Sequence, residues 1–87
     1  MKSFTTPRFW KEYALLTVET QRRAKKAYKL WAENHAHPSL HFKKVGKLWS
    51  VRVDDNHRAL ADVRGDTAHW LWIGTHAEYE RFIGPRR

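Results

Sequence analysis

Four side chains in the second half of the sequence are suited to chemistry on a phosphate group. Arg52 and Arg58 lie on either side of a short turn, so their guanidinium groups could converge. A guanidinium stays charged and donates two parallel hydrogen bonds to a phosphate. His76 and Tyr79 lie one helical turn apart, and both are side chains that transfer protons. Together these residue types could cleave RNA without a metal ion.

In that reaction a base removes the proton of a ribose 2′-hydroxyl, which then attacks the adjacent phosphate. Arginines stabilise the charge of the pentacoordinate transition state, and an acid protonates the leaving 5′-oxygen. The same spacing allows a purely structural interpretation, in which His76 caps the last helix, Tyr79 packs in the core and both arginines make surface contacts. Spacing alone leaves the two interpretations open.

Three short strands would position these residues. In the first two, apolar side chains alternate with polar ones, as in half-buried strands, and the third is almost wholly apolar; they span residues 48–53, 58–63 and 68–73. Turn residues separate them at 54–56 and 64–67, so we expect an antiparallel meander. The apolar third strand is expected to lie centrally in the sheet and to end at Gly74, before a short helix.

Two helices are expected in the first half of the chain. Thr6 and Pro7 are typical of a helix start, and Thr17 is a second N-cap, for a helix from about residue 18 to residue 34. Its predicted buried stripe is Thr20, Ala24, Ala27, Tyr28 and Trp31. Its other face carries the basic residues Arg22, Arg23, Lys25, Lys26 and Lys29. Residues 40–45 predict a further strand, and residues 1–6 are a candidate edge strand.

Strands that cluster after helices predict an α+β fold. We expect two N-terminal helices packed on one face of an antiparallel, roughly four-stranded sheet, followed by a short C-terminal helix. With 87 residues, the chain is expected to form a single domain over 1–87. The other sheet face would be open, with Arg52 and Arg58 lining it.

The charge of the sequence predicts an anionic partner. Seventeen Lys and Arg against nine Asp and Glu give a formal net charge of +8. Such an excess suits nucleic acid, an acidic protein or a membrane surface, and the alternative is a solvated basic surface with no partner. A partner helix rich in Asp and Glu would complement the basic face of residues 22–29 or cover the open sheet.

The sequence gives little support for a metal site, a cofactor site or a membrane-spanning segment. The sequence has no cysteine, and the spacing of His35, His37 and His41 matches no zinc signature, so we expect neither metal nor cofactor. No apolar run approaches the roughly 18 residues that span a bilayer, and the N-terminus lacks the apolar core of a signal peptide. We therefore expect a cytoplasmic protein.

The sequence resembles the RelE/ParE superfamily of type II toxin–antitoxin toxins. The likeness covers nearly the whole chain and rests on two N-terminal helices, the segment PSLHFKKV, the strand pair WSVRV and HRALADV, and the ending WIGTHAEYERF. It implies a small toxin with helices on one face of an antiparallel sheet, neutralised by an acidic antitoxin that wraps it. Many RelE-like members are ribonucleases that cut mRNA in the ribosomal A site by the 2′-hydroxyl route.

The resemblance also implies roles for single residues. Arg58 matches the arginine that opens the strand after the turn, and Arg52 matches a basic position that contacts phosphate. His76 stands where RelE-like toxins have Arg or His, whereas Tyr79 is a looser match because the functional tyrosine of several members lies nearer Phe82. The candidate RNA contacts are Lys43, Lys44, Lys47 and Ser50, the last at a position where some members have lysine.

Two further functions stay open at this stage. One is a ParE-like inhibitor that binds DNA gyrase and performs no chemistry. The other is a non-catalytic relative that binds RNA, whose affinity would fall steeply with salt and which would leave no cut product.

Overall fold

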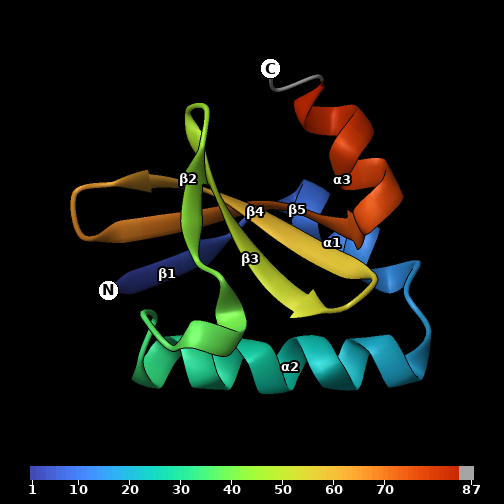
Figure 1. Ribbon diagram of the computed structural model, residues 1–87. Helices are drawn as coiled ribbons and strands as arrows, with labels where there is room; N and C mark the ends of the chain where they lie inside the picture. Colours follow the sequence, from blue (N-terminus) through green and yellow to red (C-terminus); the bar gives the residue numbers. More distant parts are fainter. Residues whose placement is uncertain (85–87) are drawn as a thin grey trace.

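The computed structural model describes residues 1–84 and contains nine elements (Figure 1). In chain order they are β1 (Lys2–Thr5), α1 (Pro7–Ala14), α2 (Val18–Glu33), the 3-10 helix η1 (Pro38–Leu40), β2 (Lys43–Val45), β3 (Leu48–Asp54), β4 (His57–Arg64), β5 (Thr67–Thr75) and α3 (His76–Ile83). The α+β fold expected from the sequence is confirmed.

One five-stranded sheet organises the described chain, in the order β1-β5-β4-β3-β2. Strands β2 to β5 pair antiparallel, as predicted, and the candidate edge strand is real: β1 pairs parallel with β5. The apolar strand β5 was predicted to be central. It is interior, but β4 is the middle strand, because β1 adds only one strand beyond β5.

Both N-terminal helices begin at their predicted caps. The hydroxyl oxygen of Thr6 accepts a hydrogen bond from the backbone N–H of Phe9, and that of Thr17 from the N–H of Thr20. Thr6 also donates to the carbonyl of Trp70, which ties the start of α1 to β5. In the described part of the chain no helix has both the length and the apolar character to cross a bilayer.

Each face of the sheet carries a buried cluster, and a bulge in β5 divides two tryptophans between them. Leu60 pairs with Trp72, but Ala61 pairs with Trp70, so Leu71 is an extra residue in β5. Because of the bulge, Trp70 packs in the core under α1 and α2, whereas Trp72 packs on the other side with Leu60 and α3. Figure 1 shows α2 and α3 on opposite sides of the sheet.

Three local expectations were wrong. Tyr28 was predicted to be buried but is 49% exposed. Leu40 was predicted to lie in a strand but is the last residue of η1, because Pro38 starts a 3-10 turn that the imidazole of His37 caps at Ser39. Gly74 was predicted to end its strand, yet β5 continues through it to Thr75.

Candidate active site

The β3–β4 hairpin places the two predicted arginines side by side. Arg52 and Arg58 are directly opposite each other in the antiparallel register, so their side chains leave the same face of the sheet. This is the face that α1 and α2 leave uncovered, because the alternating partners Val51 and Ala59 point into the core under those helices. Strand pairing therefore places both arginines on one face, and the Arg52 guanidinium is paired with the Asp55 carboxylate in the turn.

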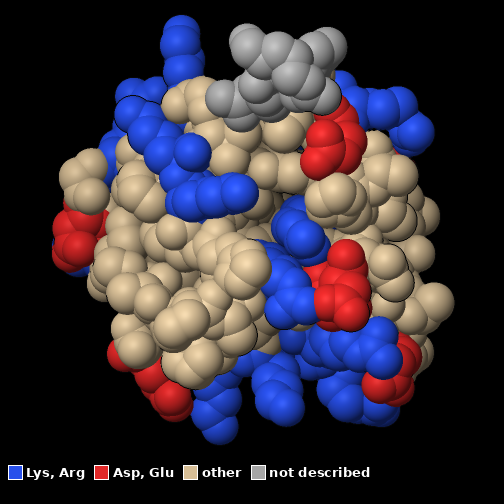
Figure 2. Space-filling view, in the orientation of Figure 1, with Lys and Arg blue, Asp and Glu red and all other residues tan. Residues whose placement is uncertain are grey.

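The arginines line a hollow of about 420 Å³ between the β2–β3 hairpin and α3. Figure 2 shows Lys and Arg atoms recessed in this face, over β3 and β4 and beside α3. The lining residues are His41, Lys43, Lys44, Val45, Ser50, Arg52, Arg58, His76, Tyr79, Glu80 and Ile83. We call this the basic hollow.

Arg58 is held firmly at the edge of the basic hollow. Its Nη1 donates to the backbone carbonyls of Asp54, at 2.6 Å, and of His57, at 2.9 Å. Burial is the largest cause that lowers the pKa of Arg58, followed by the charge of Arg52; Tyr79 and the nearby aspartates act in the opposite direction. A guanidinium stays charged at neutral pH even so, and partial burial strengthens its attraction for a phosphate.

The turn beneath Arg58 is fixed by Asp54. Its Oδ1 lies 3.0 Å from Nδ1 of His57 and accepts from the N–H of Asn56, while its Oδ2 lies 3.4 Å from Nη1 of Arg23 in α2. Burial acts to raise the pKa of Asp54, but the hydrogen bonds from His57, Asn56 and Arg23 outweigh it and lower the pKa below its ordinary value.

His76 is the first residue of α3 and stands at the mouth of the basic hollow. Its backbone N–H donates to the carbonyl of Asn56 at 2.6 Å, and its Nε2 lies 3.4 Å from a carboxylate oxygen of Glu80. Thr75 is the N-cap of α3 in a capping box with Glu78, whose pKa is lowered by the hydrogen bonds from Thr75. His76 therefore does not cap the helix; its half-buried ring lines the hollow beside Glu80.

Tyr79 fits both the structural and the functional interpretation of the sequence. It is 6% exposed and packs with Leu60 and Trp72, so it belongs to the core on this side of the sheet. It also lines the basic hollow, with its ring centroid 5.7 Å from that of His76. His76 is the more exposed of the two side chains.

The predicted RNA contacts divide between the hollow and the turn. Lys43, Lys44 and Ser50 line the hollow, and Lys43 is directly opposite Ser50 in the β2–β3 pair. Ser50 is only 3% exposed, so it forms the floor rather than a projecting contact. Lys47 does not line the hollow; it is exposed in the turn between the two strands.

Sequence reasoning missed two polar residues of the basic hollow, Glu80 and His41. Glu80 is four residues after His76 on a helix, and that spacing could have identified the pair. His41 was considered only as part of a histidine-rich loop, and its left-handed backbone (φ +47°) turns the chain into β2 beside the hollow. No local sequence pattern predicts that His41 lies at the hollow, because its position depends on the pairing of β2 with β3.

The family follows from a comparison of the sequence with protein-family models. The model of the ParE-like toxin domain matches residues 18–81. This range contains all elements from α2 to β5 and most of α3. The chain belongs to the ParE-like toxin domain family. The predicted membership of the RelE/ParE superfamily is confirmed. No curated protein matches this sequence.

Solved structures agree with the ParE-like fold. A chain of the RelB–RelE antitoxin–toxin complex from Methanococcus jannaschii has a TM-score of 0.73 at 15% identity, covering 93% of this chain and 99% of that one. The YoeB/ParE toxin from Agrobacterium tumefaciens has a TM-score of 0.69 at 15% identity, over 87% and 99%. YafQ from E. coli has a TM-score of 0.68 at 14% identity, over 90% and 96%. At these identities the likeness establishes the fold alone.

The three clustered histidines of this ParE-like domain have separate surroundings. His35 lies against the rings of Trp31 and Phe42, His37 caps η1, and His41 lines the basic hollow. Within residues 1–84 no three His, Cys, Asp or Glu side chains gather as metal ligands would.

The role of Asp54 in the ParE-like hairpin can be tested by pH. A carboxylate with a lowered pKa adds stability above its unfolded value of about 3.8, and this stability is lost as the pH falls through the lower folded value. We expect Asp54→Asn to lower the free energy of unfolding by about 1 kcal/mol at pH 7. In urea titrations the difference from the wild type should shrink as the pH falls below 3.8. Asp66→Asn, at an exposed carboxylate, is the control; a difference for Asp54→Asn that stays unchanged at low pH would contradict this role.

Proposed function

We propose that this chain is the toxin of a type II toxin–antitoxin pair and acts as a metal-independent endoribonuclease on mRNA. The observation that carries the proposal is the basic hollow, which brings Arg52, Arg58, His76 and Tyr79 together from three elements. Membership of a toxin family and a net charge of +8 support an RNA substrate and an acidic antitoxin. Solved chains of similar fold occur in RelB–RelE antitoxin–toxin complexes, which is consistent with such a partner.

In the proposed reaction the phosphate of the cleaved bond binds in the basic hollow. Arg58 and Arg52 donate to its non-bridging oxygens, and these bonds strengthen as charge builds up in the pentacoordinate transition state. His76 and Tyr79 are the proton-transferring groups for the 2′-hydroxyl and the 5′-oxygen. Lys43 and Lys44 hold the flanking backbone, and ribosome-bound mRNA is the proposed substrate.

The contribution of His76 is testable in a cell-free translation reaction. We expect His76→Ala to reduce cleavage of ribosome-bound mRNA by at least about 100-fold, as for loss of a general acid or base. Primer extension on the mRNA measures the cut sites and their rate of appearance. His69→Ala is the matched control, because His69 stacks on Phe4 of β1, away from the basic hollow. Equal rates for His76→Ala and the wild type would exclude His76 from proton transfer.

A second function, inhibition of DNA gyrase, is favoured by the ParE-like family match. It requires no chemistry, and so predicts that purified protein inhibits gyrase supercoiling and leaves mRNA intact. Inhibition of supercoiling that survives loss of Arg58 and His76 would favour this function over the ribonuclease. RNA binding that weakens steeply with salt, without a cut product, would instead identify a non-catalytic RNA binder.

A further inference from the structure

A second polar pocket adjoins the basic hollow at the free edge of β3. It has a volume of about 510 Å³, within the usual range of ligand sites, and lies between α2, η1 and the β3–β4 hairpin. The edge is free because β2 pairs only with Leu48, Trp49 and Ser50, so the rest of β3 has no neighbouring strand on that side. The 3-10 helix η1 packs against β3 there instead. We call this site the side pocket.

Arg52 joins the side pocket to the basic hollow, because its side chain lines both. The segment that leads from η1 into β2 also borders both sites: Ser39 and Leu40 line the side pocket, and His41 lines the hollow. In Figure 2, Lys and Arg atoms continue from the hollow toward α2, with Asp and Glu atoms beside them. A molecule whose phosphate lies in the basic hollow can therefore extend past Arg52 into the side pocket.

The side pocket combines an apolar floor with a polar rim. Leu40, which is 2% exposed, and the half-buried Leu30 and Val53 form the floor. Asp55 and Asn56, both exposed in the β3–β4 turn, belong to the rim. An apolar surface bordered by hydrogen-bonding groups suits a nucleobase, because its ring is flat and its edge carries donors and acceptors.

The carboxylates of the side pocket favour a base over a second phosphate. Asp54 and Asp55 both line it, and their negative charge would repel a phosphate group. Arg52 is paired with Oδ1 of Asp55, but a carboxylate has two oxygens and accepts from several donors. The other oxygen can accept a hydrogen bond from the exocyclic amino group that adenine, guanine and cytosine carry and uracil lacks.

Two further side chains of the side pocket suit an RNA strand. The backbone N–H of Asn56 donates to Oδ1 of Asp54, and its carbonyl accepts from the N–H of His76. These bonds fix the backbone of the turn and leave the exposed side-chain amide, with its donor and its acceptor, for a ligand. Lys26 of α2 lines the pocket and is exposed, so its ammonium group can meet the phosphate that follows the base.

We propose that the side pocket binds the nucleobase next to the cleaved phosphate and disfavours uracil at that position. The base packs on Leu40 and Val53, the carboxylate of Asp55 accepts from its amino group, and the amide of Asn56 bonds to its edge. Lys26 holds the next phosphate. The inference rests on the proposed ribonuclease function for the substrate, and it adds a base preference to the cut.

The first test maps the cut sites in a pool of mRNAs with randomised codons, in a cell-free translation reaction. We expect the wild type to cut at least about fivefold less often where uracil occupies one position beside the cut. Asp55→Ala should remove most of this preference and Asn56→Ala should weaken it, and the preference is a ratio that does not depend on the total rate. Asp66→Ala is the matched control, because Asp66 is an exposed carboxylate in the β4–β5 turn and does not line the pocket.

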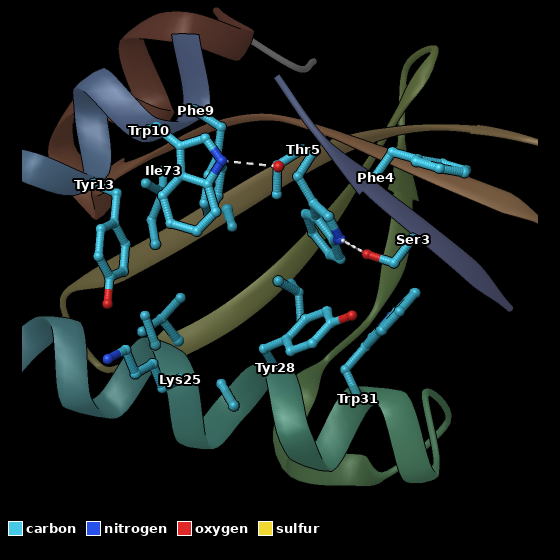
Figure 3. A pocket seen from close by; sticks show the side chains of 16 residues that line it. Ser3, Phe4, Thr5, Phe9, Trp10, Tyr13, Lys25, Tyr28, Trp31 and Ile73 are labelled. Atoms are coloured by element: carbon cyan, nitrogen blue, oxygen red, sulfur yellow. Dashed lines mark hydrogen bonds between the residues drawn. The ribbon is translucent and has the colours of Figure 1, made fainter. Parts of the chain in front are cut away.

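The second test measures affinity without cleavage, by fluorescence anisotropy with short 2′-O-methyl oligonucleotides, which lack the attacking hydroxyl. One contains only cytosine and the other only uracil. We expect the wild type to bind the cytosine oligonucleotide more tightly, and Asp55→Ala to bind both alike. Lys26→Ala should weaken both equally and reduce the salt dependence. Lys25→Ala is its matched control, because Lys25 lines the apolar groove between α1, α2 and β1 instead (Figure 3).

Three results would overturn the inference. They are wild-type cuts that do not discriminate against uracil, a base preference that Asp55→Ala and Asn56→Ala leave unchanged, and equal affinity of the wild type for the two oligonucleotides. Failure of the proposed ribonuclease would look different: the wild type would leave mRNA intact and still bind the cytosine oligonucleotide more tightly than the uracil one.

Discussion

Replacing Arg58 with alanine should slow RNA cleavage by about 100- to 1,000-fold, the usual effect of removing one preorganised donor from a transition state. Arg58 is directly opposite Arg52, and two backbone carbonyls hold its Nη1 in place. Because the guanidinium is already oriented, little reorganisation is needed when charge develops on the phosphate. Single-turnover cleavage of ribosome-bound mRNA measures the rate of the chemical step.

Two variants make the result for Arg58 specific. Arg64→Ala removes an exposed arginine at the far end of the same strand, which pairs with Asp62, and should cleave at the wild-type rate. Arg58→Lys keeps the charge but loses the planar fork, so we expect an intermediate rate. A rate for Arg58→Ala equal to that of Arg64→Ala, with both proteins folded by circular dichroism, would remove Arg58 from the active site.

Replacing Gly74 with alanine should lower the free energy of unfolding by about 2–3 kcal/mol, the cost of overpacking a filled core. A Cβ at this position would lie 2.4 Å from Cζ2 and 2.9 Å from Cη2 of Trp72, and 2.8 Å from Oε1 of Glu78. Trp72 is buried and Glu78 closes the capping box of α3, so neither neighbour can move without cost. The clash should also shift α3, and with it His76, which would lower cleavage even where the protein is folded.

Thermal and urea unfolding measure the effect of Gly74→Ala. Gly46→Ala is the comparison, because Gly46 has a φ of +63° but open space around its Cβ, and it should cost only about 1 kcal/mol. Shortening the neighbour in the double variant Gly74→Ala with Trp72→Leu should cost less than the sum of the two single changes. Additive losses would mean that the clash with Trp72 is not the cause.

Local patterns in the sequence predicted the parts of the fold that depend on neighbouring residues. Alternation of apolar and polar side chains located β3 and β4 and placed Arg52 and Arg58 on one face, away from α1 and α2. Thr6 and Thr17 predicted the helix starts because an N-cap needs only a hydroxyl three residues before a free N–H.

Other parts depend on contacts between distant residues, and local patterns could not predict them. The bulge at Leu71 sends Trp70 and Trp72 to opposite faces, although their spacing alone would place them on the same face. Tyr28 lies within a helical apolar stripe but is 49% exposed and lines an apolar pocket with residues of α1 and β1. His41 joins the basic hollow only through the pairing of β2 with β3.

The chemistry of the cut ends tests the ribonuclease proposal most directly. Attack by a ribose 2′-hydroxyl must leave a 2′,3′-cyclic phosphate on one fragment and a 5′-hydroxyl on the other, whichever residue serves as base. Ribosome-bound mRNA is incubated with the wild-type protein, and the fragments are analysed by mass spectrometry and by 5′ labelling with and without prior phosphatase. The proposal predicts 5′-hydroxyl ends that label without phosphatase treatment. Intact mRNA, or fragments with 5′-phosphate ends, would contradict it.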